Sequence, residues 1–197
     1  MEDFVVTIAR EYGSGGRLIG QQLAKELEVP FYDKELISLT AKESGLAEDF
    51  ISQMEQKKNF SYLYNLYMTS QELPLSEQVY LIQSKVIKNV AKQPCVIVGR
   101  CADYVLRDNK NCIRVFIHAS LKQRAARIRD QYGEQHPNLQ EFVHKQDKNR
   151  ASYYNYFTQN KWGEAKNYHL CIDSSIGISA TTHVIKELIA ELSGGRN

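Results

Sequence analysis

A nine-residue segment near the N-terminus combines glycines with charged side chains in a pattern that could bind phosphate. Residues 9–17 have the sequence Ala-Arg-Glu-Tyr-Gly-Ser-Gly-Gly-Arg. Glycine has no Cβ and adopts positive φ, so successive backbone N–H groups can curl around an anion at the positive end of a following helix. Arg17 is the one cation in the C-terminal half of this segment and could complete the site. The predicted phosphate-binding residues are Gly13, Ser14, Gly15, Gly16 and Arg17.

This segment departs from the common phosphate-binding pattern, Gly-x-x-x-x-Gly-Lys-Ser/Thr. With the glycines aligned, Arg10 replaces the first glycine, Gly16 occupies the lysine position, and neither Arg17 nor Leu18 after it carries the magnesium-binding hydroxyl. The first lysine of the chain, Lys25, lies about two helical turns further on, roughly 12 Å along the helix axis. Arg17 would therefore have to replace the lysine, as a planar fork instead of a mobile point charge. A glycine-rich turn that binds nothing is the alternative.

The elements around this segment have the layout of a phosphate-binding loop. Apolar, β-branched residues at 4–8 predict a strand before it, and apolar residues at helical spacing over 17–27 predict a helix after it. Further strands that alternate with helices are expected at 29–33, 94–100, 112–118 and 168–173. This alternation predicts an α/β fold with a five-stranded, doubly wound parallel sheet and right-handed crossovers.

Two charged residues follow strands at the edge where such sheets bind ligands. Asp33 ends the strand at 29–33, and it is also suited to cap the helix expected at 34–44; the two roles are compatible. Arg100 follows the apolar strand at 94–100 and is either a salt-bridge partner or a clamp for an anion. We favour the clamp because the phosphate loop is expected on the same edge.

Two later segments carry further charge. The helix after residue 118 has a basic face, and its spacing alone favours an ordinary solvated face over an arginine array that faces phosphates. The basic residues of that face are Lys122, Arg124, Arg127 and Arg129. Segment 131–166 is long, charged and poor in apolar residues, which is typical of a closing lid.

The composition limits the class of protein. A chain of 197 residues predicts a single domain over 1–197, and a net charge of +2 is too mild to indicate nucleic acid or an anionic membrane as a partner. Four cysteines without paired C-x-x-C spacing indicate neither a metal site nor a disulfide framework. The N-terminus is acidic where a signal peptide is basic, and no apolar run reaches the ~18 residues of a membrane span. We therefore expect a cytoplasmic protein.

Segment 45–75 is harder to interpret. It is expected to be helical and to lie on the substrate side, and its residues 60–68 are rich in aromatic side chains without a clean period. A substrate lid, a surface for a homodimer and ordinary packing are all compatible with this pattern, and packing is the default.

The chain as a whole resembles the cytidylate kinase-like proteins, bacterial relatives of cytidylate kinase among the nucleoside monophosphate kinases. The stretches that carry the resemblance are residues 9–17, Pro-Phe-Tyr-Asp-Lys-Glu-Leu-Ile at 30–37, Val-Ile-Val-Gly-Arg at 96–100, Asp-Lys-Asn-Arg-Ala-Ser-Tyr-Tyr at 147–154, and residues 167–175. The resemblance implies a P-loop kinase fold with strand order 2-3-1-4-5 and a helical lid. It also implies phosphoryl transfer from ATP to CMP or dCMP with Mg²⁺.

The resemblance also implies roles for individual residues. Residues 13–17 would hold the phosphates of ATP, and Asp33 would lie near the metal and the acceptor phosphate. Arg124 and Arg127 would lie near the lid helix that closes on ATP, and Arg124 would be a further ATP-binding residue. The acceptor-binding residues would be Arg100, Asp147 and Arg150, and the catalytic residues would be Arg17, Asp33 and Arg127.

One feature of true cytidylate kinases is missing, and this keeps other functions open. The lid arginine that those enzymes carry one turn before the aspartate is absent, and Val143 and His144 occupy that neighbourhood. A kinase of another small-molecule acceptor is one alternative. A non-catalytic nucleotide-binding regulatory protein is the other, because Gly16 stands at the lysine position and neither Arg17 nor Leu18 after it carries a hydroxyl.

Overall fold

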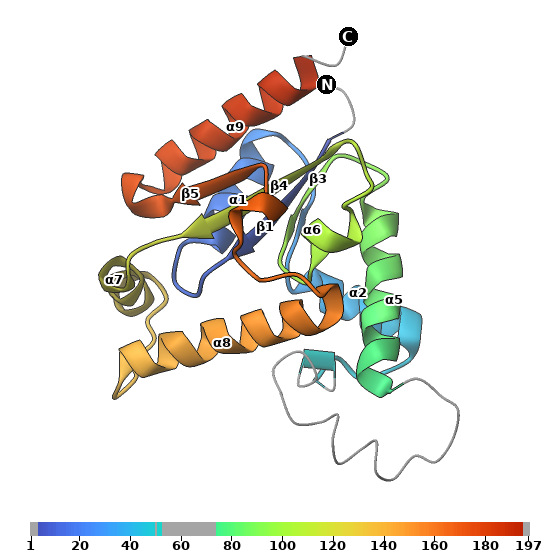
Figure 1. Cartoon of the computed structure of the whole chain (residues 1–197), viewed down its shortest axis with the longest axis horizontal. Coiled ribbons are helices and arrows are strands. Elements are labelled where there is room, and N and C mark those ends of the chain that lie inside the picture. The colour runs from blue at the N-terminus through green and yellow to red at the C-terminus, as the bar shows by residue number, and fades with distance from the viewer. Residues whose placement is uncertain (1–3, 50, 53–73, 195–197) are drawn as a thin grey trace.

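The protein is built on one parallel sheet. The computed structural model describes residues 4–49, 51–52 and 74–194. Within these residues, five strands pair in parallel in the order β2-β3-β1-β4-β5 (Figure 1). The strands are β1 (Val5–Arg10), β2 (Phe31–Tyr32), β3 (Cys95–Val98), β4 (Cys112–His118) and β5 (Leu170–Asp173). The predicted fold class, strand number and strand order are confirmed.

The central strand is β1, and its position explains its sequence. It pairs with β3 at one edge and with β4 at the other, and helices pack on both of its faces. A parallel strand in this position is almost continuously apolar, and the β1 side chains from Val5 to Ala9, that of Thr7 included, are buried. The loop that follows Arg10 therefore starts from the most constrained part of the sheet.

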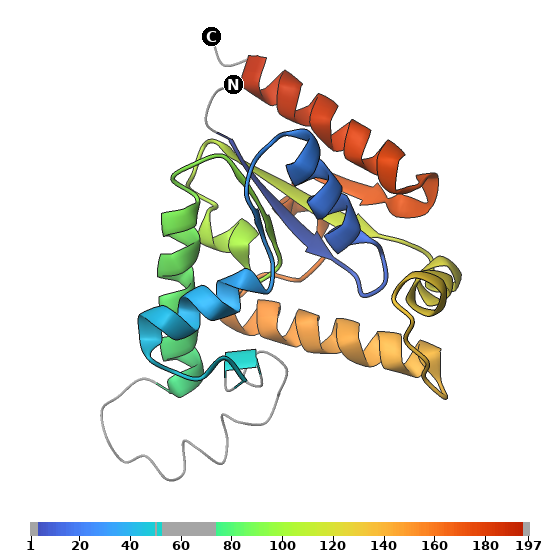
Figure 2. The ribbon, with the colours of Figure 1, turned by 180° about the vertical axis from the view of Figure 1, so that it is seen from behind.

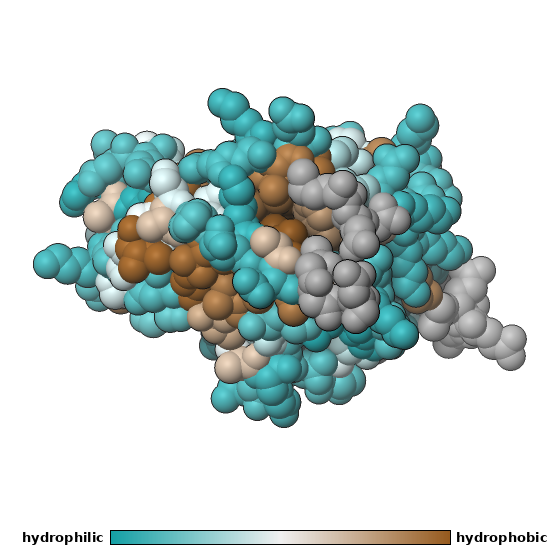
Figure 3. Space-filling view, turned by 90° about the horizontal axis from the view of Figure 1, so that it is seen from above, coloured by the Kyte–Doolittle hydropathy of each residue, from teal (hydrophilic) through white to brown (hydrophobic). Residues whose placement is uncertain are grey.

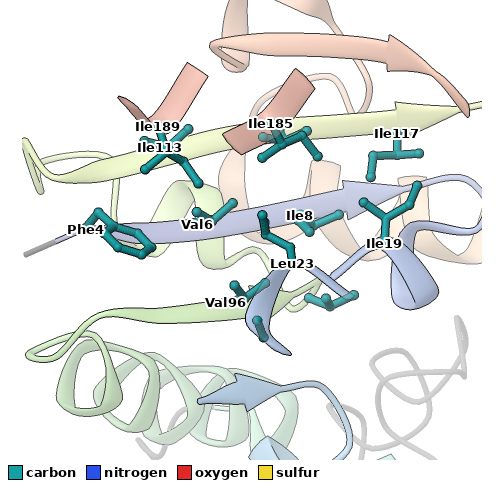
Figure 4. Packing of buried hydrophobic residues seen from close by; sticks show 13 residues of the cluster. Phe4, Val6, Ile8, Ile19, Leu23, Val96, Ile113, Ile117, Ile185 and Ile189 are labelled. Atoms are coloured by element: carbon teal, nitrogen blue, oxygen red, sulfur yellow. The ribbon is translucent and has the colours of Figure 1, made fainter. Parts of the chain in front are cut away.

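Helices cover both faces of the sheet (Figures 1 and 2). On one face, α1 and α9 pack through Leu23 and Ile185 against the apolar side chains of β1, β3 and β4 (Figure 4). On the other face, α2, α5 and α6 pack around Ile97. The described helices are α1 (Gly16–Glu26), α2 (Glu35–Ser44), α5 (Leu75–Val90), α6 (Ala102–Val105), α7 (Leu121–Gln131), α8 (Leu139–Thr158) and α9 (Ile178–Gly194), with 3₁₀ turns η1 (Ala165–Asn167) and η2 (Ser174–Ile176).

The edge strand β2 is shorter than the sequence predicted. It contains two residues where five were expected, and Pro30 explains part of the difference because proline has no N–H to donate to a ladder. The Pro30 carbonyl still accepts a hydrogen bond from Val96 N. This hydrogen bond fixes the start of β2 against β3. The register of the two strands then brings Asp33, which follows β2, to the ligand edge of the sheet.

The structure describes all of segment 131–166 but only the ends of segment 45–75. The first contains the 20-residue helix α8, which buries Val143 and Tyr154 and is therefore better packed than its charged sequence suggested. Most of the second, including the aromatic residues 60–68, lies outside the residues that the structure describes.

Part of the surface is hydrophobic. Hydrophobic residues gather on the face shown in Figure 3. Ile176 and Val184 are among the exposed large hydrophobic side chains, and neither lines the pocket at the end of β1. Among the helices of residues 4–49, 51–52 and 74–194, none has the length and apolar character needed to cross a membrane.

We predict that Leu23→Ala lowers the free energy of unfolding by about 3 kcal/mol, because it opens a cavity between α1 and the sheet. Leu23 is fully buried, whereas Leu81 on α5 is 47% exposed, so Leu81→Ala is the matched control and should change stability by less than about 0.5 kcal/mol. Urea denaturation of both variants measures the difference. Equal losses for the two variants would contradict this description of the core.

Candidate active site

A pocket of about 930 Å³ lies where β1 and β3 end. Its wall includes the loop between β1 and α1, the start of α2, the residues that follow β3 and one side of α8. The carboxyl ends of parallel strands are the usual ligand-binding edge of such sheets. The pocket is therefore in the position that the sequence predicted for the site.

The glycines of the loop are required by its conformation and its packing. Gly13 and Gly15 have φ values of +76° and +84°, which L-residues with side chains rarely adopt. A Cβ on Gly13 would lie 2.8 Å from Cδ1 of Ile128, and a Cβ on Gly15 would lie 2.8 Å from Cδ1 of Ile178. The loop is thus pressed against α7 and the start of α9.

Three consecutive carbonyl groups of the loop accept hydrogen bonds from residues behind it. The Arg124 guanidinium donates to Tyr12 O (3.2 Å), the Arg127 guanidinium donates to Gly13 O (2.8 Å), and the Ser174 hydroxyl donates to Ser14 O (2.5 Å). The N–H of a trans peptide points opposite to its carbonyl. The N–H groups of Gly13 and Gly15 therefore point away from these residues, on the side of the pocket that both glycines line.

The first turn of α1 adds further donors to this side of the loop. Gly15 caps the helix without a side-chain hydrogen bond, and the first N–H groups of any α-helix lack partners within the helix. No acidic residue lies in the first turn of α1. Together with the helix dipole, these N–H groups form a preorganised site for an anion.

Asp33 is the centre of a positively charged cluster. Its buried carboxylate lies 3.0 Å from Arg17 Nε, 3.6 Å from Arg10 Nη2 and 3.6 Å from Arg100 Nη1. The prediction that Asp33 caps the next helix is wrong, because Lys34 is the N-cap of α2 and no side chain caps that helix. One carboxylate facing three guanidinium groups leaves an excess of positive charge beside the loop.

The basic face of α7 is not uniformly solvated, so the preference for a solvated face is wrong at Arg124. This side chain is 7% exposed, and it pairs with Asp147 of α8 and lies 3.5 Å from Glu11 of the loop. Arg127 is half-buried and lies over Gly15. Both arginines brace the loop from behind, while Arg129 on the same helix stays exposed.

The helix α8 is held against the loop by several contacts. Asp147 Oδ1 accepts a hydrogen bond from Tyr12 N (2.7 Å), and Arg150 Nη1 donates to Arg10 O (3.0 Å). The Tyr12 hydroxyl donates to the Glu134 carboxylate, and burial with this neighbour raises the pKa of Tyr12. Arg150 lies over the Tyr12 ring, and burial lowers the pKa of the Arg150 guanidinium.

The structure brings most of the predicted site residues together, and it divides them into two groups. The pocket wall contains Gly13, Gly15, Gly16, Arg17, Asp33, Arg100 and Arg150. Ser14, Arg124, Arg127 and Asp147 are not part of that wall, and the hydrogen bonds above place them behind the loop.

The pocket wall also contains residues that were not predicted from the sequence, among them Arg10, Tyr12 and Glu134. The Glu134 carboxylate accepts a hydrogen bond from the Tyr12 hydroxyl. A signal for Arg10 was present, because an arginine stands where the common pattern has its first glycine. Tyr12 and Glu134 are 122 residues apart, and no pattern in the sequence connects them.

The fold and the site together define a class of protein. A parallel sheet of order 2-3-1-4-5, with a glycine-rich anion loop between its central strand and the first helix, is the fold of P-loop kinases. The chain belongs to the cytidylate kinase-like family, whose sequence model matches residues 5–176. No curated protein matches the sequence.

Solved structures agree with this class. An uncharacterized protein from Eubacterium ventriosum is 27% identical, with a TM-score of 0.73 over 95% of this chain and 98% of that one. Shikimate kinase from Bacteroides thetaiotaomicron is 15% identical (TM-score 0.55; 95% and 98% covered). A gluconokinase from Sinorhizobium meliloti is 14% identical (TM-score 0.53; 97% and 92% covered). The two kinases share the fold with this chain.

We predict that Asp147→Ala lowers the free energy of unfolding by about 3 kcal/mol, because it leaves the buried Arg124 guanidinium without its closest carboxylate. Asp108 is the control, since its side chain is 88% exposed and pairs weakly with Arg107. Guanidinium chloride denaturation should show a change of less than about 0.5 kcal/mol for Asp108→Ala. A similarly small change for Asp147→Ala would show that Asp147 does not support the loop.

Proposed function

We propose that this protein transfers the γ-phosphoryl group of ATP to a nucleoside monophosphate, with CMP and dCMP as the first candidates. The proposal rests on one observation: a single pocket is lined by two groups of residues, each of which could bind an anion. The outward-facing N–H groups of the loop suit the phosphates of a donor, and Arg100 and Arg150 in the same pocket suit a second phosphate. The pocket volume is in the range of small-molecule sites.

On the donor side, we propose that the loop residues 13–17 hold the β- and γ-phosphates of ATP. Arg17 would neutralise charge that develops during transfer. Arg124 and Arg127 would act from behind, as positioning residues that keep the loop carbonyls turned away from the phosphates. Asp147 would hold Arg124 in place.

On the acceptor side, we propose that Arg100 and Arg150 bind the phosphate of the nucleoside monophosphate. An oxygen of that phosphate would attack the γ-phosphorus, and the bond to the β–γ bridging oxygen would break to release ADP. Such a step depends on position and charge neutralisation more than on a protein nucleophile. The arginine-rich pocket fits this requirement.

Magnesium is the ion that kinases of this class use with ATP, and a carboxylate next to the loop has the chemistry to hold it. Mg²⁺ prefers oxygen ligands, and the Asp33 carboxylate lines the pocket next to the loop. Neither Arg17 nor Leu18 offers a hydroxyl where the common pattern provides one after its lysine. Asp33 would therefore hold the ion, which would screen the phosphate charge.

We further propose a single domain over 1–197, with 131–166 as a lid over ATP and 45–75 on the substrate side. Nucleotides are the proposed partners, beside a second copy of the chain in a homodimer, and neither nucleic acid nor a membrane is proposed. A cytoplasmic location fits the four free cysteines. One of them, Cys95, is buried, and burial raises the pKa of its thiol to about 12.

The decisive experiment is phosphoryl transfer from Mg-ATP to a panel of acceptors, with products identified by mass. The panel contains CMP, dCMP, UMP, AMP and GMP, together with shikimate and gluconate, the acceptors named by the structural neighbours. Conversion of CMP and dCMP above the rest supports the proposal. Conversion of another compound shows a kinase with a different acceptor. ATP binding that is equally tight with and without Mg²⁺, with no transfer, indicates a regulatory protein.

We predict that Arg17→Ala lowers the rate of transfer by about 10²–10³-fold, the usual effect of removing a preorganised charge stabiliser. Lys25→Ala on the exposed side of the same helix is the control for a lost positive charge, and its rate should equal that of the wild type. Steady-state kinetics at saturating ATP measure both. An unchanged rate for Arg17→Ala would exclude this residue from the reaction.

We also predict that Arg100→Ala and Arg150→Ala raise the KM of the acceptor by about tenfold or more, as expected for the loss of a charge-assisted hydrogen bond. The KM of ATP should change less in both variants. A larger effect on ATP than on the acceptor would reverse the assignment of the two sides of the pocket.

A further inference from the structure

Compared with the common phosphate-binding pattern, this loop exchanges two residue types. Arginine stands at the position of the first glycine, Arg10, and glycine stands at the lysine position, Gly16. The two residues lie at opposite ends of the loop in sequence, one at the end of β1 and the other at the start of α1. The structure connects these two departures.

The Arg10 side chain occupies the space that a side chain at residue 16 would need. A Cβ on Gly16 would lie 2.6 Å from Arg10 Cβ and 2.9 Å from Arg10 Cγ. The φ of Gly16 is not in the left-handed region, so its backbone conformation would accept other residues. It is the position of Arg10 that requires a glycine here, and the two departures form one coupled change.

The guanidinium of Arg10 is held at the mouth of the loop. A Cβ on Gly99 would overlap Arg10 Nη1, so the end of β3 also leaves room for this side chain. Arg10 Nη2 lies 3.6 Å from Asp33, and the side chain is 19% exposed, compared with 48% for Arg17. Arg10 is thus more firmly positioned than Arg17, and it lines the same pocket.

We infer that Arg10 supplies the phosphate-binding cation that the lysine supplies in the common pattern, reaching the donor phosphates from the opposite end of the loop. This inference rests on the proposed function, because it concerns the donor side of the same site. A guanidinium binds two phosphate oxygens at once, and a side chain already fixed by its surroundings loses little entropy on binding. Arg10 and Arg17 would then bind the donor together.

The test is calorimetric binding of inorganic tripolyphosphate and of ATP, without Mg²⁺, to a set of variants. Arg10→Met removes the charge but keeps an unbranched side chain over Gly16, and it should weaken binding of both probes about tenfold or more. Arg129→Ala removes an exposed arginine of α7 and should bind as the wild type does. Wild-type affinity in Arg10→Met would overturn the inference.

An exchange of the two residues gives a second, independent test. Arg10→Gly should weaken tripolyphosphate binding as Arg10→Met does. Gly16→Lys alone should bind no better than the wild type, since its Cβ collides with Arg10. The double variant Arg10→Gly/Gly16→Lys restores the first glycine and the lysine of the common pattern and should regain most of the lost affinity. Failure of the double variant to bind better than Arg10→Gly, with an unchanged thermal unfolding temperature, would contradict the coupling.

These outcomes separate this inference from the proposed function. A wild-type protein that binds neither ATP nor tripolyphosphate would remove the basis of both. A wild-type protein that binds both probes, with variants of Arg10 that bind them equally well, would leave the kinase proposal standing and would overturn the role of Arg10 alone.

Discussion

The three hydrogen bonds to the carbonyl groups of residues 12–14 are the constraint on which the site depends. Their donors, Arg124, Arg127 and Ser174, come from α7 and η2, which follow β4 and β5. The strand order 2-3-1-4-5 places β4 beside β1 and β5 beside β4, so the chain segments after these strands reach the back of the loop. Without these bonds, the glycines would leave the loop free to turn its carbonyl oxygens towards the anion.

Charge is arranged in two layers around this loop. Behind it, Arg124 is compensated by Asp147 and Glu11, so the supporting layer is neutralised internally. In front of it, one carboxylate, Asp33, faces several guanidinium groups, and the excess positive charge is directed into the pocket. A buried charge without a partner is costly, and this division lets the pocket stay positive without destabilising the support.

The fold could be predicted well because each strand, helix and turn is marked by residues within its own segment of the sequence. Apolar runs of strand length, alternating with helices, were enough for a doubly wound sheet, and the glycines marked the loop. The site was predicted less completely because the roles of its residues depend on distant partners. The spacing of Arg124 indicated a solvated face, whereas in the structure Arg124 pairs with Asp147. The position of Asp33 indicated a helix cap, whereas in the structure three arginines surround it. No sequence pattern indicated the contact between Tyr12 and Glu134.

The central claim is that the loop is a preformed anion site made of backbone N–H groups. An NMR titration of the ¹⁵N-labelled protein with ATP tests it most directly, because each amide reports on its own hydrogen bond. The account predicts that the largest chemical-shift changes fall on the amides of Gly13, Gly15, Gly16 and Arg17, with small changes in α9. Saturation of the protein with ATP while these amides remain unchanged would contradict it.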